Sequence, residues 1–468
     1  MKGADVMAKK QLTIEEKLQA ALVPVEEQPY KVPENWCWVR LDKLYQVNPK
    51  NEDVDEDTRA AFIPMANIDG GLTSNFTYEI QSWKQAKKGH TQMADGDVAF
   101  AKISPCFENR KSMIVEGLEN GIGGGTTELI ILRQPNVNKE YTFWLVSTEE
   151  FISKGCTTYS GTVGQQRISM DFVKNYPVPL APLNEQSRIV ARIESLFAKL
   201  DEAKEKIQEV LDGVDLRRAA ILHQAFTGKL TEKWRRENGV SDESWEYKSI
   251  KEIAVPRAGV AFDSKKFSTK GYQVIRMGNL YNGELDLSRN PVYYPREFLD
   301  NKILERALIH NDDILITLTG TKYKRDYGYA VKMVNPEKLL VNQRILCLTA
   351  IKEYVLSDYL NYYLQTKLFR DVFFSNETGG VNQGNVSSKF VESIVIKVPL
   401  VDEQQEIVHL LDNLLSREQS TVTACEEALT TIDTLKKSIL ARAFRGELGT
   451  NDPAEPNAKE LLKEILSA

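Results

Sequence analysis

The sequence predicts an α+β protein, with two related mixed domains joined by two long helices and a pseudo-twofold internal repeat. Two observations predict this class. The first is a self-similarity, because residues 185–230 and 403–448 align without a gap at an offset of 218 and are identical at 14 of 46 positions. The second is the hydrophobic pattern, because each copy has short strand-like runs followed by one long stretch of helical periodicity. At 468 residues the chain has room for about three domains of ordinary size.

The composition is that of a globular protein, with 42% hydrophobic and 27% charged residues and a net charge of −6. Apolar runs such as residues 313–318 are far shorter than the roughly 20 residues that span a bilayer, and residues 1–7 lack a signal-peptide core. We therefore expect a soluble cytoplasmic protein without a membrane partner. The cysteines are scattered and have no metal-ligand spacing, which predicts reduced thiols rather than disulfides or a zinc site: Cys37, Cys106, Cys156, Cys347 and Cys425.

An N-terminal helical segment is predicted over residues 1–30. The pattern Thr13-Ile-Glu-Glu16 is a capping box, in which a hydroxyl and a carboxylate satisfy each other's backbone N–H groups at a helix start. The helix that begins there is expected to run to Leu22. We also expect it to pack near a short helix over residues 458–466.

The two variable domains, residues 31–181 and 236–398, alternate β-branched runs with turn residues. Their copies drift in register, since Trp36 matches Trp245 at an offset of 209 and Asp97 matches Asp313 at 216. Helices are expected at 141–152 and 357–374, which predicts mixed or mainly antiparallel sheets. The expected strands are 62–68, 98–103, 129–132, 274–277, 314–318 and 345–348.

The two segments that contain the gap-free part of the repeat are predicted to be helical spacers. They cover residues 182–235 in the centre and 399–468 at the C-terminus. Gly213 is expected to be a local soft spot in the first helix, because glycine costs about 1 kcal/mol relative to alanine. Four-three spacing of apolar residues is the seam of a coiled coil. The first seam is Ile189, Ile193, Leu196, Leu200, Ala203, Ile207, Val210, Val214, Arg217 and Ile221; the second is Ile407, Leu411, Leu414, Glu418, Thr421, Cys425, Ala428, Ile432, Leu435 and Ile439.

A helix from residue 185 to 226 would be on the order of 60 Å long and cannot be buried inside one compact domain. Two such helices bury their apolar stripes most simply against each other, as an intramolecular antiparallel coiled coil with the variable domains at opposite ends. The alternative is a coiled coil that dimerises separate molecules.

Basic and amide side chains gather in the variable domains although the whole chain is acidic. Lys and Arg neutralise phosphates, and Arg, Asn and Gln make paired hydrogen bonds to base edges, so these residues are candidate DNA ligands. A solvated charged face is the competing interpretation of any one group. The candidates are Lys84, Lys87, Lys102, Asn109, Arg110, Lys111, Gln165, Lys265, Arg276, Asn279, Lys322, Lys324, Arg325 and Gln383.

No catalytic constellation is predicted. Gly320-Thr-Lys322 lacks the earlier glycine of a phosphate-binding loop, and Asn290-Pro-Val-Tyr293 lacks the second proline of an adenine methyltransferase motif. The four histidines are unpaired in sequence, which gives no metal-ligand spacing.

Several motifs, in the same order in both copies, resemble the DNA specificity subunit of type I restriction-modification systems over essentially the whole chain. Residues 182–190 and 399–408 open the long helices, and residues 224–234 and 442–448 close them. Residues 103–109 and 342–344 are similar to motifs of the family's target recognition domains. After Leu448 the second copy departs from the first, because it lacks the Thr-Glu-Lys-Trp extension.

This resemblance implies a non-catalytic subunit whose two target recognition domains each read one half of a bipartite site in double-stranded DNA. It implies that the helices set the gap between half-sites and dock two methyltransferase subunits, and that restriction subunits complete the enzyme. S-adenosylmethionine, ATP and magnesium would be bound by those partners, with no cofactor or metal on this chain. The residues implied in the spacer and in subunit docking are Ile189, Ile193, Leu196, Leu200, Ile207, Val214, Phe226, Ile407, Leu411, Leu414, Ile432, Ile439 and Phe444.

Two other functions remain open from the residues alone. A coiled-coil scaffold with two tandem ligand-binding domains would show no sequence-selective, salt-sensitive DNA binding. A self-sufficient DNA enzyme would transfer methyl groups from S-adenosylmethionine without a partner.

Overall fold

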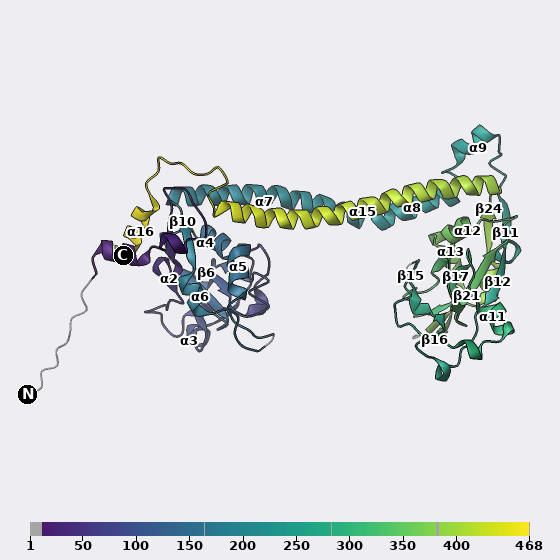
Figure 1. Cartoon of the computed structure of the whole chain (residues 1–468), viewed down its shortest axis with the longest axis horizontal. Helices are drawn as coiled ribbons and strands as arrows, with labels where there is room; N and C mark the ends of the chain where they lie inside the picture. The colour runs from purple at the N-terminus through teal and green to yellow at the C-terminus, as the bar shows by residue number, and fades with distance from the viewer. Residues whose placement is uncertain (1–11, 163, 282, 381–382, 468) are drawn as a thin grey trace, which may run out of the picture. The chain divides into compact units, whose positions relative to one another are not determined.

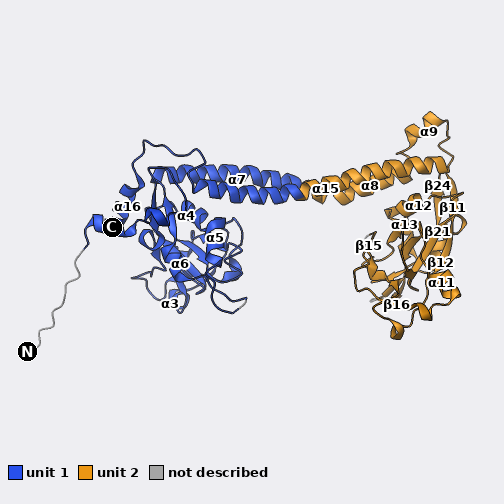
Figure 2. Ribbon diagram, viewed as in Figure 1, with its two compact units in different colours: residues 1–207, 427–468 blue, residues 208–426 orange. Residues whose placement is uncertain are grey.

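The computed structural model describes residues 12–162, 164–281, 283–380 and 383–467, so residues 1–11 of the expected N-terminal segment lie outside it. The chain divides into two compact units (Figure 2). Unit 1 comprises residues 1–207 and 427–468, and unit 2 comprises residues 208–426.

Unit 1 contains the first variable domain together with both ends of the described chain. Its strands are β1 (Cys37–Arg40), β2 (Gln46–Val47), β3 (Arg59–Ile63), β4 (Glu79–Ser82), β5 (Thr91–Ala94), β6 (Val98–Ala101), β7 (Ser112–Ile114), β8 (Ile122–Gly125), β9 (Leu129–Arg133) and β10 (Pro177–Leu180). Its helices are α1 (Ile14–Ala21), α2 (Leu41–Leu44), α3 (Trp83–Lys87), α4 (Lys139–Val146), α5 (Glu149–Cys156), α6 (Met170–Asn175), α16 (Ala458–Ser467) and parts of α7 (Leu183–Asp212) and α15 (Val401–Ala443).

Unit 1 has one antiparallel and one mixed four-stranded sheet. The orders are β2-β9-β6-β7 and β4-β3-β8-β5, and β3 pairs with β8 in parallel whereas the other neighbours are antiparallel. The glycines of β8 allow a helix to lie directly on the sheet, because a Cβ on Gly124 would be 1.9 Å from the carbonyl oxygen of Ala86 in α3. The ring of Trp83 in α3 is buried.

Unit 2 repeats this plan with the second variable domain. Its strands are β11 (Glu246–Ser249), β12 (Ala254–Ala258), β13 (Tyr272–Ile275), β14 (Leu280–Tyr281), β15 (Glu284–Leu285), β16 (Tyr293–Tyr294), β17 (Ile314–Thr317), β18 (Thr319–Gly320), β19 (Ala330–Lys332), β20 (Leu339–Val341), β21 (Ile345–Ala350), β22 (Thr378–Gly380), β23 (Gln383–Asn385) and β24 (Val395–Val398). Its helices are α8 (Val214–Phe226), α9 (Glu232–Asn238), α10 (Ile250–Ile253), α11 (Asn301–Ala307), α12 (Ser357–Leu364), α13 (Lys367–Ser375), α14 (Ser388–Ser393) and the remainder of α7 and α15.

The sheet β12-β21-β17-β19 of unit 2 corresponds to β2-β9-β6-β7 of unit 1, and the parallel pair β13 and β20 corresponds to β3 and β8. The expected mixed α+β character of both variable domains is therefore confirmed. Each expected domain helix is divided in two. Thr148 and Thr366 cap new helices, since their hydroxyls accept hydrogen bonds from the N–H groups of Phe151 and Phe369.

The long helices follow the expected apolar stripes with three corrections. Val210 and Leu435 are 39% and 44% exposed and Thr421 is exposed, so the expected seam is wrong at these positions. The reason is that an α-helix has 3.6 residues per turn, so a strict four-three alternation rotates away from the partner. The half-buried residues are instead Leu211, Val422 and Lys436. At Gly213, the expected soft spot, the first helix is divided into α7 and α8, whereas a single helix was expected through this position.

Within each unit the two long helices lie side by side and run in opposite directions (Figure 1). In unit 1, Arg188 donates to the carbonyl oxygen of Thr450, and further along α7 Asp201 pairs with Lys436. The ammonium of Lys436 also lies 5.0 Å from the ring centroid of Phe197. In unit 2, Arg217 of α8 pairs with Glu418 of α15 at 3.0 Å.

The expected packing of the first helix against the last is confirmed within unit 1. The capping box of Thr13 and Glu16 opens α1, whose Leu18 is buried together with Leu462 of α16. Lys17 donates to the carbonyl oxygen of Leu466 at 3.0 Å. The described N-terminal and C-terminal segments therefore belong to one hydrophobic core with the first variable domain.

Candidate nucleic-acid interface

A polar groove of about 440 Å³ lies on unit 2 where three segments meet beyond the end of β17. The N–H of Leu318 donates to the carbonyl oxygen of Arg344 at 2.9 Å, and β18 pairs with β23 in the hairpin β22–β23. The expected DNA ligand Gln383 lies in this groove with an exposed side chain. The groove is lined by Leu318, Thr319, Gln343, Arg344, Gly379, Gly380, Gln383 and Asn385.

A second groove of about 450 Å³ shares Gln343 and Arg344 with the first. Two expected ligands, Arg276 and Asn279, line this groove, but their side chains are hydrogen-bonded to backbone carbonyl groups of neighbouring loop residues. The side-chain nitrogen of Asn279, which is 3% exposed, donates to the carbonyl oxygens of Asp286 and Arg289 at 2.9 Å. The guanidinium of Arg276 donates to the carbonyl oxygen of Asn290. The remaining lining residues are Phe262, Phe267, Met277, Gly278, Arg289, Asn290 and Asn342.

The basic loop between β18 and β19 lies next to the hairpin. Lys322 donates to the carbonyl oxygen of Gly379 at 2.9 Å, while Lys324 is exposed. Arg325 is 3.6 Å from Asp371 and lies over the ring of Phe374 at 5.2 Å. Lys265, also exposed, lies on a separate turn of the same unit.

In unit 1 the expected ligands divide into two groups. Lys102, which is half-buried, and Gln165, which is exposed, lie beside an ion pair between Glu128 and Arg167. Asn109 is exposed on a separate loop. Arg167 donates to both carboxylate oxygens of Glu128, with Nη2 at 2.7 Å and Nε at 2.9 Å from their acceptors. These hydrogen bonds hold the pKa of Glu128 below its ordinary value.

The second group of expected ligands in unit 1 is engaged within the protein. Arg110 donates to the carbonyl oxygen of Ser147 at the end of α4 and pairs with Glu149. Lys111 donates to the carbonyl oxygen of Met65 at 2.9 Å. Lys84 and Lys87 share the carboxylate of Glu56, at 3.1 and 3.3 Å, and their hydrogen bonds lower the pKa of Glu56.

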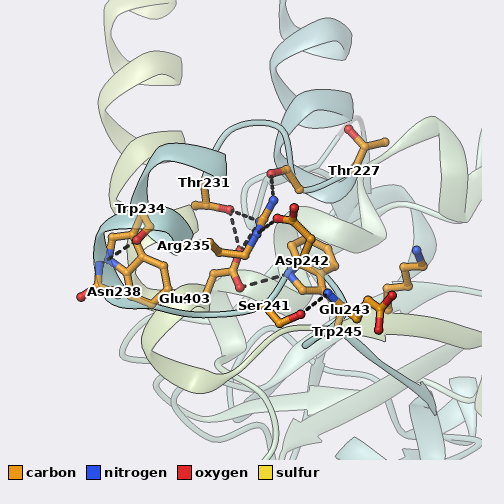
Figure 3. Close-up of polar contacts among 12 residues, drawn as sticks. Thr227, Thr231, Trp234, Arg235, Asn238, Ser241, Asp242, Glu243, Trp245 and Glu403 are labelled. Atoms are coloured by element: carbon orange, nitrogen blue, oxygen red, sulfur yellow. Dashed lines mark hydrogen bonds and ion pairs between the residues drawn. The ribbon is translucent and has the colours of Figure 1, made fainter.

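The start of α15 is fixed by a buried carboxylate (Figure 3). Glu403 is 0% exposed; its Oε1 accepts hydrogen bonds from Arg235 at 2.6 Å and Thr231 at 2.7 Å. Its Oε2 accepts from the indole of Trp245 at 3.0 Å. Arg235 also pairs with Asp242 at 2.9 Å and donates to the carbonyl oxygen of Gly228. The carboxylate therefore ties the end of α8, the linker after it and the domain entrance to one helix terminus.

The start of α7 is fixed in the same way with different partners. Glu185 is also 0% exposed, and its Oε2 accepts from the indole of Trp36 at 2.7 Å and from the amide of Asn451 at 2.9 Å. Arg188 pairs with Glu455 at 2.8 Å. The segment after Leu448, where the second copy departs from the first, thus takes the place that α9 and Arg235 have in unit 2.

The neighbouring glutamines attach each helix start to a domain helix. Oε1 of Gln186 accepts from the N–H of Asn138 at 3.0 Å, and Oε1 of Gln404 accepts from the N–H of Leu356 at 2.8 Å. Both acceptors lie at the N-terminal cap of α4 or α12, where N–H groups lack helical partners. The repeated Glu-Gln dipeptide is therefore a junction between spacer and domain.

The expected spacer and docking residues fall into two classes. Phe226 and Phe444 pack on their own domains, with ring centroids 5.2 Å from Tyr359 and 4.9 Å from Tyr141, and both are buried. Neither ring is therefore available to a partner subunit. Ile189, Ile193, Ile407, Leu411 and Ile432 are buried; Leu196, Leu200, Ile207, Val214, Leu414 and Ile439 are half-buried along the helices.

Arg344, which lines both grooves together with Gln343, was not among the candidate DNA ligands, although residues 342–344 are similar to a motif of the family's target recognition domains. The signal that could have found both residues is their position directly after β20, in a motif of exposed polar residues before the next strand. Among the described residues there is no group of three or more His, Cys, Asp or Glu side chains arranged to hold a metal ion. None of the helices in the described ranges combines the length and hydropathy that a membrane span needs.

The chain matches the family model of the type I restriction modification DNA specificity domain twice, over residues 33–212 and 242–427. It is similar to the EcoAI specificity subunit of Escherichia coli, at 26% identity over 83% of this chain and 79% of the relative. It is also similar to the EcoEI specificity subunit of Escherichia coli, at 26% identity over 84% of this chain and 81% of the relative. The crystal structure of the HsdS subunit from Thermoanaerobacter tengcongensis superposes with a TM-score of 0.65 at 19% identity, over 90% of this chain and all of that one. The likeness to that structure concerns the fold.

Proposed function

The chain belongs to the family of type I restriction-modification DNA specificity subunits, and from this premise we propose how its parts divide the work. As a specificity subunit it has a recognition role and is non-catalytic. The variable domain of unit 1 reads one half of a bipartite site in double-stranded DNA, and that of unit 2 reads the other half. The observation that carries this assignment is the double family match, because each matched range contains nearly all of one variable domain.

The chemistry of the exposed groups supports this assignment. The grooves of unit 2 present Arg344, Gln343 and Gln383, and the equivalent surface of unit 1 presents Gln165, Lys102 and the Glu128–Arg167 pair. Arginine and amide side chains read base edges, whereas lysines contact phosphates. Two different sets of side chains on one repeated fold suit two different half-sites.

The long helices act as the spacer between the half-sites. In this proposal α7 and α8 pair with α15 along their full length as an intramolecular antiparallel coiled coil. The ion pairs Asp201–Lys436 and Arg217–Glu418 support such pairing, since each joins the helices within its own unit. A stiff spacer fixes the separation of the domains and therefore the number of base pairs between half-sites.

The exposed surfaces of the helices dock two methyltransferase subunits, and restriction subunits complete the complex. Relatives of this chain are named as specificity subunits of type I restriction enzymes, which supports such an assembly. S-adenosylmethionine, ATP and magnesium are assigned to the partner subunits in this proposal. The protein acts in the cytoplasm, where its DNA target lies.

Methylome sequencing tests the proposed function. The full chain is expressed with its methyltransferase subunits in a host that lacks DNA methylation, and the methylated sequences are collected. The expected result is one bipartite motif with a fixed gap, and no methyl transfer when the purified chain alone is incubated with DNA and S-adenosylmethionine. Methylation without a motif, a single contiguous motif, or transfer by the chain alone would contradict the proposal.

A further inference from the structure

The backbone around the first groove of unit 2 has a counterpart in unit 1. In unit 2 the N–H of Leu318 donates to the carbonyl oxygen of Arg344 at 2.9 Å, and in unit 1 the N–H of Lys102 donates to that of Glu128 at 2.8 Å. The carbonyl oxygen of Leu318 accepts from the N–H of Val386 at 2.9 Å. That of Lys102 accepts from the N–H of Ile168 at 3.0 Å. Leu318 and Lys102 therefore occupy the same central position between two neighbouring segments.

The third segment is a hairpin with the same pairing in both units. Ser160 pairs with Arg167 in unit 1, and Thr378 pairs with Asn385 in unit 2. The glycine that follows the first residue of each pair has a positive φ, +112° at Gly161 and +105° at Gly379. A side chain is strained at such a φ, so both turns depend on glycine. The backbone of this surface is thus the same in both units although most of its side chains differ.

Four pairs of equivalent positions carry the side chains of this surface. They are Lys102 and Leu318, Glu128 and Arg344, Gln165 and Gln383, and Arg167 and Asn385. We propose that these four positions form the base-reading platform of each recognition domain, with Arg344 reading guanine in one half-site and Glu128 reading cytosine in the other. The inference rests on the proposed function and specifies the residues and the bases through which it acts.

Arg344 has the exposure and the freedom that base reading requires. Its side chain is exposed, lines both grooves, and has no hydrogen bond or ion pair to any part of the chain that the structure describes. Arginine donates two parallel hydrogen bonds to O6 and N7 of guanine, which is the commonest specific contact in the major groove. Asn385 beside it is held by Thr319, whose hydroxyl lies 3.1 Å from its side-chain oxygen.

At the equivalent backbone position of unit 1, Glu128 presents a hydrogen-bond acceptor where Arg344 presents donors. Nε and Nη2 of Arg167 are both occupied by the carboxylate of Glu128, and Nη1 donates to the carbonyl oxygen of Gln165 at 3.1 Å. These bonds use three of the five N–H groups of Arg167 and hold its guanidinium against Glu128. The carboxylate retains lone pairs that can accept from the N4 amino group of cytosine. Arg167 is therefore a positioning residue that aims Glu128.

The first experiment substitutes Arg344→Ala in the full chain and measures the methylome with the methyltransferase subunits. The control is Arg306→Ala, which removes an exposed arginine from α11 in the same unit. For Arg344→Ala we expect one guanine of one half-site to become degenerate, with discrimination there falling about 10- to 100-fold, and the other half-site unchanged. For Arg306→Ala we expect the original motif.

The second experiment substitutes Glu128→Ala, with Glu150→Ala as the control. Glu150 forms an exposed ion pair with Lys154 on α5, outside the platform. We expect Glu128→Ala to remove the requirement for a cytosine in the half-site that Arg344→Ala leaves intact. Arg167→Ala should weaken the same preference, and Arg167→Lys should restore only part of it, because lysine cannot form the two-pronged contact.

The result that overturns the platform is an unchanged motif with uniformly weaker binding to all duplexes, since that assigns the side chains to phosphate. A change in the same half-site for both Arg344→Ala and Glu128→Ala would also overturn it. Each variant is first shown to form a complex with the methyltransferase subunits, so that a loss of folding is not mistaken for a loss of base preference. Failure of the proposed function itself is visible separately, because the unsubstituted chain would then yield no bipartite motif.

Discussion

Glu185 and Glu403 illustrate how a short repeated dipeptide acquires a physical role when it is buried. Each carboxylate is fully buried at the first turn of a long helix and accepts from a tryptophan indole at the domain entrance. A buried carboxylate is costly unless hydrogen bonds satisfy it, and both are satisfied. The geometry of each junction is thus specified by groups that tolerate little displacement.

Removing the carboxylate of Glu403 should loosen unit 2 strongly. Glu403→Ala removes the buried partner of Arg235 and leaves it only the exposed carboxylate of Asp242, and breaking a buried pair in this way costs about 3–5 kcal/mol. The expected result is a lower midpoint of thermal unfolding and faster proteolysis of the linker after α8. The matched control is Glu237→Ala on α9, whose side chain is 62% exposed and 3.7 Å from Lys233, with an expected change below about 0.5 kcal/mol. Equal effects of the two substitutions would contradict the role of the junction.

The Glu128–Arg167 pair makes a pH-dependent contribution whose sign follows from the pKa. Arg167 lowers the pKa of Glu128, so the pair stabilises the folded state above the carboxyl's ordinary value of 4.5. This contribution is lost as the pH falls through the lowered pKa. Carbon-13 NMR of the Glu128 carboxyl should give a midpoint below 4.5, and Arg167→Ala should raise it. Identical midpoints in both proteins would show that the pair does not form in solution.

Residue types in the sequence did not separate the polar side chains that line the grooves from those that are used within their own loops. Asn279 and Arg344 illustrate the difference. Asn279 satisfies backbone groups of its own loop, whereas Arg344 extends into two grooves, and both are polar residues next to strands. The equivalence of Glu128 and Arg344 is hidden in the sequence because the residues carry opposite charges. It depends on hydrogen bonds between distant segments.

At the level of elements, the interruption between α7 and α8 is coupled to the packing of α15. A Cβ on Gly213 would lie 2.5 Å from Nη1 of Arg217. The same guanidinium pairs with Glu418 and donates to the carbonyl oxygen of Val210 at 2.9 Å. Gly213 therefore gives space to an arginine that joins two helices in unit 2.

A double-mutant cycle at Gly213 and Arg217 measures this coupling. Gly213→Ala should stabilise the Arg217→Ala protein by about 1 kcal/mol, the ordinary gain in helix propensity. In the presence of Arg217 the gain should be smaller, because the new methyl group displaces the guanidinium from Glu418. Urea unfolding followed by circular dichroism gives the four midpoints. Additive effects would remove the steric link between the two residues.

Most helix and strand positions could be predicted from periodicity. The expected strand 62–68 is wrong after Ile63, where β3 ends and a 3-10 turn follows. The seam drifts at Val210 and Leu435 because the helical repeat is not 3.5 residues. The domain helices divide at Thr148 and Thr366 because a capping threonine can end one helix and open the next. A hydrophobic pattern continues through both kinds of site, so it does not reveal them.

At the level of the whole molecule, the proposed spacer makes a direct prediction about the target sequence. Inserting one heptad into α7 and a matching heptad into α15 lengthens the pair by about 10 Å at 1.5 Å per residue. We expect the gap between half-sites to increase, by no more than the roughly three base pairs that this length of duplex contains. Both half-sites should be unchanged in the methylome.

A heptad in α7 alone is the matched control for this experiment. It leaves α15 at 43 residues, so the two helices no longer correspond and we expect loss of methylation rather than a new gap. An unchanged gap after the paired insertion would contradict the spacer, and altered half-sites would assign the effect to the domains.

The repeat could be predicted from the sequence because its apolar and junction residues are shared between the two copies. The bases of the half-sites could not be predicted from the sequence, because the residues at the proposed base-reading positions differ between the two copies.

The strands at which the chain enters and leaves each variable domain are direct neighbours. β1 and β10 are antiparallel neighbours, with Cys37 opposite Leu180. β11 and β24 are antiparallel neighbours in the same way, with Glu246 opposite Val398. A gene segment that runs from the first strand of such a pair to the second encodes a whole recognition domain, whose two ends lie next to each other in the protein. Recombination at these two short stretches can therefore exchange one reader for another and create a new target while the junctions and helices stay as they were.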